Sequence, residues 1–446
     1  MTLASRVRDA VLWQARRLLG NSAGLQYLYG WLKLAIGQLE VKRHRDFHAL
    51  ECFCNVSARV AQDFSCRRRA RSYLQQYFVT KNADKDETLR RDFLSSRHAR
   101  SLRRRYTQEP FPRNLTFHEG MLPLKPFCPD TGEPGVLLMK YNFLFRTFYA
   151  TYEMERLREN YWIVLEPSYH RFEDAGFALF RGGTTFIEAR NPVLSRGLRT
   201  WGGEFHPVML NSGDWVDPDV FRPLRDGEKK YDLILVGNWS RNKRHELLFA
   251  TLAKRAARWR VALVGFPWER TRRDIERQMR RFGVASQCDV FEKLSAEEVN
   301  RLLNASRINL MLSEKELANK ALYEAMFAGV PCLASAGCMG LDRDVINPQT
   351  GMLAEDDELG DAIEYMLAHL HHYKPREWAT AKTGCWRATR TLNEVLRQVS
   401  SKMGVAWSHD IAVKVNRPNL DYKDPQDHVR FRPTLEHLAT LLRPSR

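Results

Sequence analysis

Two apolar runs in the second half of the chain constrain its fold more than any other feature. They are residues 231–237 (YDLILVG) and 260–266 (RVALVGF), and each leads through a polar turn into a helical stretch. Apolar strands of this kind are typical of parallel sheets that helices cover on both faces. Two further runs, 308–312 and 330–334, leave room for helices between them. This alternation predicts an α/β fold with a doubly wound parallel sheet, whose ligands bind at the carboxyl ends of the strands.

The length of 446 residues exceeds what one hydrophobic core usually organises, so more than one domain is expected. Proline and glycine cluster between residues 110 and 135, which indicates a boundary near residue 130. Apolar runs at 136–139, 162–165 and 184–187 predict the strands of a second α/β domain. We therefore expect four segments: a basic, mostly helical segment 1–130, Rossmann-like domains at 131–226 and 227–384, and a C-terminal helix and tail at 385–446.

The net charge of +17 implies a partner class, because such a potential attracts polyanions or anionic lipid. Residues 1–22 form a basic amphipathic pattern that fits either a helix packed on the protein's own core or a helix on a membrane surface. No apolar stretch is long enough to span a bilayer, and the first residues lack a secretory signal pattern. The expected location is cytoplasmic, with a peripheral position on the inner face of the membrane left open.

The eight cysteines are scattered, without a CxxC pair or a histidine at zinc-like spacing. Reduced structural thiols are the favoured interpretation. Metal binding by Cys52 and Cys54 is the less favoured alternative.

Residues 313–331 (SEKELANKALYEAMFAGVP) carry the most specific pattern in the chain. Asn319 is a suitable N-cap, Gly329 a suitable residue after the C-cap, and Pro331 a helix stop, so a helix of about ten residues is predicted. Its N-terminus should face the carboxyl ends of the strands. Free backbone N–H groups there, together with the helix dipole, favour binding of a phosphate.

Two glutamates flank this helix start. Glu316 lies just before the helix and Glu324 within it, a rise of about 12 Å if the interval were helical. One carboxylate could accept hydrogen bonds from sugar hydroxyls and the other from the two ribose hydroxyls, with phosphates between them. Two solvated glutamates would be the ordinary explanation of the spacing alone, but the position between buried strands favours a nucleotide-sugar site.

Residues 316–331 resemble the retaining glycosyltransferases of the GT-B fold, family 4 or "group 1", whose mark is Glu-x7-Glu running into Glu-Ala-Met-x-x-Gly-x-Pro. The resemblance extends over residues 211–370 and includes the segments 217–223 (DPDVFRP), 264–267 (VGFP) and 350–353 (TGML). It implies a GT-B architecture of two Rossmann-like domains facing a cleft, with a basic helical N-terminal extension. It also implies a nucleotide-diphosphate sugar as donor, no cofactor, and retention of configuration.

In that family the loop after the first donor-domain strand supplies an arginine and a lysine to the diphosphate. The loop here begins at Gly237, and Lys243 takes the place of the lysine. Asn238 stands where the arginine is usual, and Arg241 is the candidate substitute. The resemblance thus assigns Lys243 and Glu316 to catalysis.

The same resemblance assigns Gly237, Arg241, Asn319, Lys320 and Glu324 to donor binding. Fixed cations can stabilise the leaving diphosphate, so no metal is expected. We expect the pair Asp356-Asp357 to cap the following helix rather than to bind a metal.

The sequence indicates fewer candidate residues on the acceptor side. The family's glycine-rich loop after the first strand is absent, because residues 140–146 read KYNFLFR. His170 is the best candidate for a catalytic-region histidine, with a structural role as the alternative, and His118 is a weaker candidate.

The leading hypothesis is therefore a glycosyltransferase that moves a sugar from a nucleotide-diphosphate donor to a glycan or lipid-linked acceptor, in cell-surface polysaccharide or glycolipid synthesis. A catalytically silent GT-B scaffold is one alternative, and a basic nucleic-acid-binding protein is another. Because no nucleic-acid-binding module is visible, a nucleic-acid partner is not expected.

Overall fold

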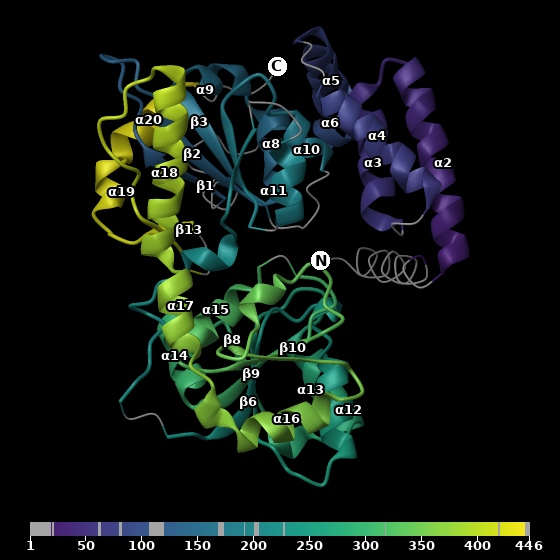
Figure 1. Ribbon diagram of the computed structural model, residues 1–446, viewed down its shortest axis with the longest axis vertical. Helices are drawn as coiled ribbons and strands as arrows, with labels where there is room; N and C mark the ends of the chain where they lie inside the picture. The colour runs from purple at the N-terminus through teal and green to yellow at the C-terminus, as the bar shows by residue number, and fades with distance from the viewer. Residues whose placement is uncertain are drawn as a thin grey trace. The chain divides into compact units, whose positions relative to one another are not determined.

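The chain forms two compact units in a computed structural model (Figure 1). The structure describes residue 19 and residues 22–60, 64–79, 83–106, 120–167, 174–190, 192–199, 205–225, 228–316, 318–417 and 420–441. Unit 1 comprises Met1–Met209, Val395–Ile411 and Gln426–Arg446, and unit 2 comprises Leu210–Glu394 and Ala412–Pro425. Among the described residues, no helix combines the length and apolar character that a membrane crossing requires.

Unit 1 is built around a five-stranded sheet in the order β1-β2-β3-β4-β5. Strand β1 is antiparallel to β2, and the remaining neighbours are parallel. Helices follow the parallel strands, which gives a Rossmann-like arrangement. The elements are β1 (Met121–Lys125), β2 (Gly135–Lys140), α8 (Asn142–Thr151), α9 (Met154–Asn160), β3 (Tyr161–Glu166), α10 (Ala175–Ala178), β4 (Thr185–Glu188), α11 (Pro192–Arg199) and β5 (Phe205–Val208).

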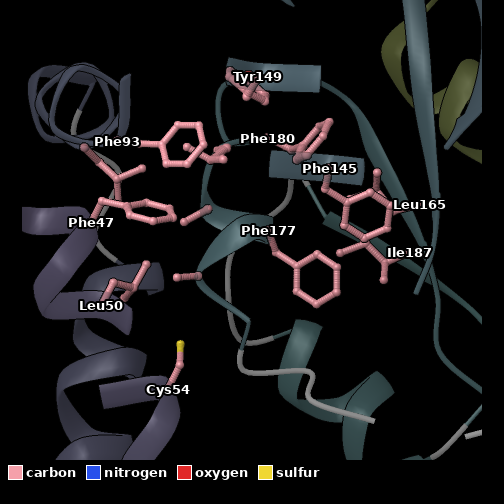
Figure 2. Packing of buried hydrophobic residues seen from close by; sticks show 14 of the residues in the cluster. Phe47, Leu50, Cys54, Phe93, Phe145, Tyr149, Leu165, Phe177, Phe180 and Ile187 are labelled. Atoms are coloured by element: carbon pink, nitrogen blue, oxygen red, sulfur yellow. The ribbon is translucent and has the colours of Figure 1, made fainter. Parts of the chain in front are cut away.

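The N-terminal helices share one hydrophobic core with this sheet. Phe47 and Phe93 come from these helices and join Phe145, Phe177 and Phe180 in a single buried cluster (Figure 2). Arg146 on α8 adds an ion pair to Glu51, so charge as well as apolar packing joins the two parts. The helices are α2 (Ala23–Lys42), α3 (Asp46–Arg59), α4 (Ser65–Val79), α5 (Ala83–Ser95) and α6 (Arg97–Tyr106).

The C-terminal part is divided between the units. Its elements are α18 (Cys385–Met403), β12 (Lys414–Asn416), β13 (Leu420–Tyr422), α19 (Asp427–Arg430) and α20 (Arg432–Leu441). In unit 1, Ser408 donates its backbone N–H and its hydroxyl to the buried carboxylate of Glu133, at 2.7 and 2.6 Å. In unit 2, the β12–β13 hairpin packs on the segment that precedes β6. The structure thus groups the chain into two units, whereas the sequence predicts four segments.

Unit 2 contains a six-stranded, fully parallel sheet in the order β11-β10-β9-β6-β7-β8. The chain winds outward from β6 through β7 to β8 and then returns to the other side of β6 with β9. Its strands are β6 (Tyr231–Val236), β7 (Val261–Gly265), β8 (Cys288–Glu292), β9 (Ser306–Met311), β10 (Cys332–Ser335) and β11 (Gly351–Ala354). Its α-helices before α18 are α12 (His245–Lys254), α13 (Arg272–Arg281), α14 (Ala296–Asn304), α15 (Lys320–Phe327), α16 (Leu359–Ala368) and α17 (Pro375–Lys382).

The predicted fold class is confirmed. Both units are α/β structures with predominantly parallel sheets, as in the paired Rossmann-like domains of the GT-B architecture, and the described N-terminal region is helical. The winding of the second sheet reverses at β6, and a reversal of strand order is where open α/β sheets bind ligands.

Candidate functional site

The loop after β6 places a lysine over a glycine. The aliphatic stem of Lys243 passes so close to Gly237 that a Cβ at that position would lie 3.1 Å from Lys243 Cε. Lys243 ends a short 3-10 helix, η2 (Arg241–Lys243). A glycine at residue 237 therefore leaves room for the lysine to lie along the carboxyl end of β6.

The Lys243 ammonium forms an ion pair with the Glu316 carboxylate. The Ser313 hydroxyl donates a second hydrogen bond to the same carboxylate oxygen, at 2.7 Å. The two charged side chains are only 15% and 13% exposed. Charge-assisted hydrogen bonds in such a partly buried setting hold both groups in defined positions.

Asn242 fastens the loop after β6 to the loop after β9. Its side chain donates to the Lys315 carbonyl at 3.0 Å and accepts from the Lys315 N–H at 3.1 Å. Its backbone carbonyl accepts from the Glu314 N–H. On the other side, the Glu316 N–H donates to the Met339 carbonyl at 3.0 Å. The segment that carries Glu316 is thus held from two directions.

Arg244 joins three strand ends, and sequence reasoning missed it. Its guanidinium donates to the Leu312 carbonyl at 2.6 Å after β9, to the Ser335 hydroxyl at 2.9 Å at the end of β10, and to both carboxylate oxygens of Asp356 beyond β11. Its backbone lies in the left-handed region at φ 49°, an uncommon conformation for a residue with a side chain. A positive φ cannot be read from an arginine in a sequence, so no local signal marked this residue.

The predicted capping role of Asp356 is wrong. The N-cap position of α16 is Glu358, and no side chain donates or accepts a capping hydrogen bond there. Asp356 instead binds Arg244 in a bidentate ion pair. A fork of two parallel hydrogen bonds to a guanidinium is a stronger use of a carboxylate than one bond to a helix N-terminus.

Helix α15 begins and ends close to where the sequence predicts. Asn319 occupies the N-cap position, although its side chain makes no capping hydrogen bond, and the helix has eight residues rather than about ten. At the other end, Gly329 has a φ of 80°, and the N–H groups of Gly329 and Val330 donate to the Met326 and Ala325 carbonyls. This is the Schellman arrangement that the glycine predicts.

Helix α15 begins with a lysine, and a buried carboxylate follows one turn later. Glu324 is only 4% exposed and lies 2.9 Å from the Lys320 ammonium. Lys320 also donates to the Arg417 carbonyl at 3.1 Å, which brings the β12–β13 hairpin to the start of the helix. Arg417 lies far along the chain in a region without a motif, so sequence reasoning could not find this contact.

Of the remaining predicted site residues, Arg241 lies in the described part of the chain and the two histidines do not. The Arg241 N–H donates to Glu269 at 2.7 Å, which fixes the start of η2. His170 and His118 lie outside the described residues, as does the amphipathic pattern 1–22.

Two buried groups next to the site have shifted pKa values. Burial first, and then the charges of Arg270 and Lys243, lower the pKa of His245 to about 4, whereas Glu246 opposes this shift. Burial raises the pKa of Cys338 to about 11. The imidazole and the thiol are therefore both neutral near pH 7, and the charges at this edge come from the lysines, arginines and carboxylates.

Metal-ligating groups do not gather in the part of the chain that the structure describes. Within it, no three His, Cys, Asp or Glu side chains come together in a way that could hold a metal ion. None of the eight cysteines, all of which lie in the described part of the chain, forms a disulfide.

The site lies within a segment that matches a known family. Residues 217–381 match the family model "Glycosyl transferases group 1". This group 1 segment, residues 217–381, covers less than half of the chain and contains Gly237, Lys243, Glu316 and Glu324. No curated protein matches the chain in sequence.

Three solved structures whose source organism is known are similar in fold to parts of this chain. Sucrose-phosphate synthase from Thermosynechococcus elongatus is 20% identical, with 60% of this chain and 74% of that chain covered and a TM-score of 0.49. HepE from Anabaena, in complex with UDP-glucose, is 14% identical, with 59% and 78% covered and a TM-score of 0.47. The C-terminal domain of a group 1 family glycosyl transferase from Francisella tularensis is 20% identical, with 37% and 97% covered and a TM-score of 0.32. Likenesses this distant carry no assignment of activity.

Proposed function

We propose that the protein is a glycosyltransferase that uses a nucleotide-diphosphate sugar as donor. One observation carries the proposal: within the group 1 segment, Lys243 from the loop after β6 and Glu316 from the segment that leads into α15 form an ion pair at the carboxyl edge of a parallel sheet. An anion placed there would meet a fixed cation and the free N–H groups of a helix N-terminus. A carboxylate stands on each side of that helix start, Glu316 before it and Glu324 inside it.

The proposed roles follow from charge and position. Glu324, buried in the first turn and a half of α15, accepts hydrogen bonds from the two ribose hydroxyls, and Glu316 accepts them from hydroxyls of the sugar. Lys243, with the N–H groups at Asn319 and Lys320, faces the diphosphate, and Arg241 adds a second cation. These assignments need the Lys243–Glu316 and Lys320–Glu324 pairs to open or to be shared with the substrate.

In the proposed reaction, the bond from the anomeric carbon to the diphosphate oxygen breaks, and its electron pair leaves with the diphosphate. An acceptor hydroxyl forms the new bond to the anomeric carbon and gives up its proton, which the diphosphate oxygen accepts. Negative charge grows on the diphosphate as the bond breaks, so the preorganised ammonium of Lys243 stabilises the transition state more than the ground state. Retention of configuration and independence of metal ions remain predictions from the family resemblance.

The acceptor is proposed to be a glycan or a lipid-linked sugar of a cell-surface polysaccharide or glycolipid. His170 keeps its proposed role near the reaction centre on the acceptor side. A cytoplasmic location, at the inner face of a membrane, stays a prediction from the sequence.

The first test is a screen for stabilisation by UDP, GDP and ADP sugars, because a ligand that binds the folded state raises its apparent stability. With the best nucleotide, Glu324→Gln should weaken binding by about 1.5 to 3 kcal/mol, since it replaces a charged acceptor by a neutral one. Calorimetry on the folded variant measures this. Glu358→Gln, an exposed glutamate at the start of α16, is the matched control and should bind as the unchanged protein does.

Equal affinity of Glu324→Gln and the unchanged protein would remove Glu324 from the ribose site. A failure of all three nucleotide classes to stabilise the protein would contradict the proposed function itself.

A further inference from the structure

Helix α2 exposes an apolar face that no described residue of unit 1 covers. Its exposed positions from residue 23 to residue 41 are all apolar or aromatic: Ala23, Gly24, Leu25, Tyr27, Leu28, Leu32, Ala35, Leu39 and Val41. Leu28 is 67% exposed and Leu32 is 61% exposed. A contiguous apolar surface of this kind on a soluble unit marks an interaction site.

The exposed positions form one stripe along the helix. Leu25, Leu28, Leu32, Ala35 and Leu39 are separated alternately by three and four residues, the spacing that keeps side chains on one helical face. The stripe covers four turns of the helix, without a charged residue among its members. In Figure 1, α2 is the outermost helix of the N-terminal group, with α3 and α4 on its inner side.

Close packing on the opposite face fixes the orientation of the stripe. A Cβ at Gly30 would lie 2.5 Å from Cys66 Sγ on α4, and a Cβ at Gly37 would lie 2.5 Å from the Phe53 ring on α3. These glycines allow the helices to approach so closely that α2 cannot rotate to bury its leucines. The apolar stripe is therefore presented outward by the packing of unit 1 itself.

Basic and aromatic side chains border the stripe. At the end of the helix, Lys42, Arg43, His44 and Arg45 are all exposed. Glu40 pairs with Arg43 at 3.4 Å and with Arg45 at 3.6 Å, and a second carboxylate, Asp46, follows directly in the chain. Beside the helix, the Arg69 guanidinium lies 5.2 Å from the centre of the Trp31 ring. Three permanent cations, Lys42, Arg43 and Arg45, against two carboxylates, Glu40 and Asp46, leave this end of the helix with a net charge of +1.

We infer that this face of α2 docks on an anionic lipid bilayer, with the leucines in the acyl boundary and the basic end at the headgroups. An apolar helix face next to tryptophan, tyrosine and basic side chains is the composition of an interfacial helix. Net charge supports the choice of partner, because a chain of +17 is attracted by an anionic surface. The docking surface goes beyond the proposed sugar transfer, which it does not require.

A second copy of this chain fits the face less well. A coiled-coil seam of this spacing is usually flanked by charged residues that pair across the interface, whereas the flanking positions here are Tyr29, Trp31, Ile36 and Gln38. Two copies would also each bring a charge of +17 to the contact. Self-association is therefore an outcome for the test rather than the proposal.

The test is co-sedimentation of the full chain with vesicles of phosphatidylcholine and phosphatidylglycerol, and with vesicles of phosphatidylcholine alone. Replacing Leu28→Glu and Leu32→Glu together should lower partitioning onto the anionic vesicles about tenfold or more, since two leucines lose their transfer into the acyl boundary. The matched control replaces two apolar side chains of similar exposure elsewhere, Val429→Glu with Trp386→Glu, and should bind as the unchanged protein does.

The basic end is tested separately. Lys42→Ser with Arg43→Ser should lower binding to the anionic vesicles by about fivefold for each cation and leave binding to neutral vesicles unchanged. Raised salt should weaken binding of the unchanged protein more than that of this variant. Equal salt sensitivity of the two proteins would overturn the assignment of these cations to the headgroups.

A milder variant guards against misfolding. Leu28→Ala with Leu32→Ala keeps good helix formers and adds no charge, so it should fold as the unchanged protein does and still lose part of its vesicle binding. Nucleotide binding measured on the same variants should not change, which separates this inference from the proposed function.

Vesicle binding unchanged in both leucine variants would overturn the proposal. A second result would also overturn it. This result is a dimer of the unchanged protein in sedimentation velocity that the leucine variants abolish, together with no vesicle binding by either the unchanged protein or the variants.

Discussion

The carboxyl edges of the two sheets are both charged, but they obtain their charges in different ways. In unit 2 the charged groups come from loops, and Lys243, Glu316 and Arg244 remain partly exposed. In unit 1 they are the last residues of the strands themselves: Lys140 ends β2 and Glu166 ends β3, in register with each other. These two groups lie 3.3 Å apart and are almost fully buried. The charged groups of the unit 2 edge are therefore partly accessible to solvent, whereas the ion pair of the unit 1 edge is almost fully buried.

The turn after β2, next to the buried Lys140–Glu166 pair, has an uncommon backbone conformation. Where the glycosyltransferase family has a glycine-rich loop, this chain has Tyr141 at a φ of 72°, a conformation that costs a residue with a side chain about 1 to 3 kcal/mol. The Tyr141 N–H donates to the Glu166 carbonyl at 3.0 Å, and Lys140 lies 5.1 Å from the centre of the tyrosine ring. An ion pair and a ring thus occupy the edge where a glycine loop would leave backbone accessible.

The largest expected effect separates the two edges by stability. Lys140→Ala leaves the carboxylate of Glu166 buried without its cation, which typically costs about 3 to 5 kcal/mol. Burial alone would lower the pKa of Lys140, but the charge and hydrogen bond of Glu166, together with the charges of Tyr141 and Glu188, outweigh it and raise that pKa, so Lys140 stays protonated in the folded unit. Chemical denaturation of variant and unchanged protein measures the loss. A change under about 1 kcal/mol would show that water or another cation takes over the role of Lys140.

The next effect concerns rate rather than stability. Lys243→Ala should lower the rate of sugar transfer, or of slow donor hydrolysis, about 100- to 1000-fold, because one preorganised electrostatic donor is lost. Donor affinity should fall less than turnover, since the charge on the diphosphate grows as the bond breaks. Glu316→Ala should behave similarly through loss of orientation of the sugar.

This comparison uses single-turnover assays of both variants with and without EDTA. Full activity in Lys243→Ala would transfer the role to Arg241 or another cation, and activity abolished by EDTA would contradict a metal-free mechanism. Absence of transfer and of hydrolysis in the unchanged protein, despite nucleotide binding, would favour the silent scaffold.

Much of unit 2 could be predicted from sequence because its strands are continuous apolar runs and its helix ends carry strong signals. Strands β6 and β7 coincide with the predicted runs, and Gly329 ends α15 as expected. Strand β8 escaped prediction because it is only partly buried and its sequence, CDVFE, contains no apolar run. The bridge from Arg244 to Asp356 depends on strand order and a left-handed residue, and neither leaves a local pattern.

Unit 1 was harder to predict for a different reason. Its core combines helices that precede residue 107 with a sheet that follows residue 120, and arginine-rich helix faces hide the buried positions. Strand β1 precedes the boundary that the Pro and Gly cluster indicates, yet it pairs with β2. Long-range packing of this kind depends on which faces meet, and a single sequence does not encode that in any one segment.

The smallest expected effect is a difference between the two units in how their stability depends on pH. In unit 2, His245 is 1% exposed and its pKa is lowered to about 4, by burial first and then by Arg270 and Lys243. In unit 1, burial raises the pKa of Glu133, but hydrogen bonds from Lys125 and Ser408 outweigh it and lower that pKa to about 2. The Glu133 contribution is therefore complete above about pH 4.5 and disappears only as the pH falls toward 2. The His245 contribution falls earlier, as the pH drops from about 6.5 to about 4, because the unfolded chain binds a proton that the folded unit excludes.

Between pH 7 and pH 5 the histidine should thus reduce stability by about 2 kcal/mol, while Glu133 contributes no pH dependence. His245→Gln removes the titrating group at nearly the same volume, so its free energy of unfolding should decline less over this interval than that of the unchanged protein. Denaturation in urea at several pH values, with unit 2 monitored through nucleotide binding, measures the difference between the two slopes. Equal slopes of unfolding free energy against pH in the two proteins would mean that His245 gains a proton in the folded unit. The cations near it, Arg270 and Lys243, would then be further away or better screened than the structure indicates.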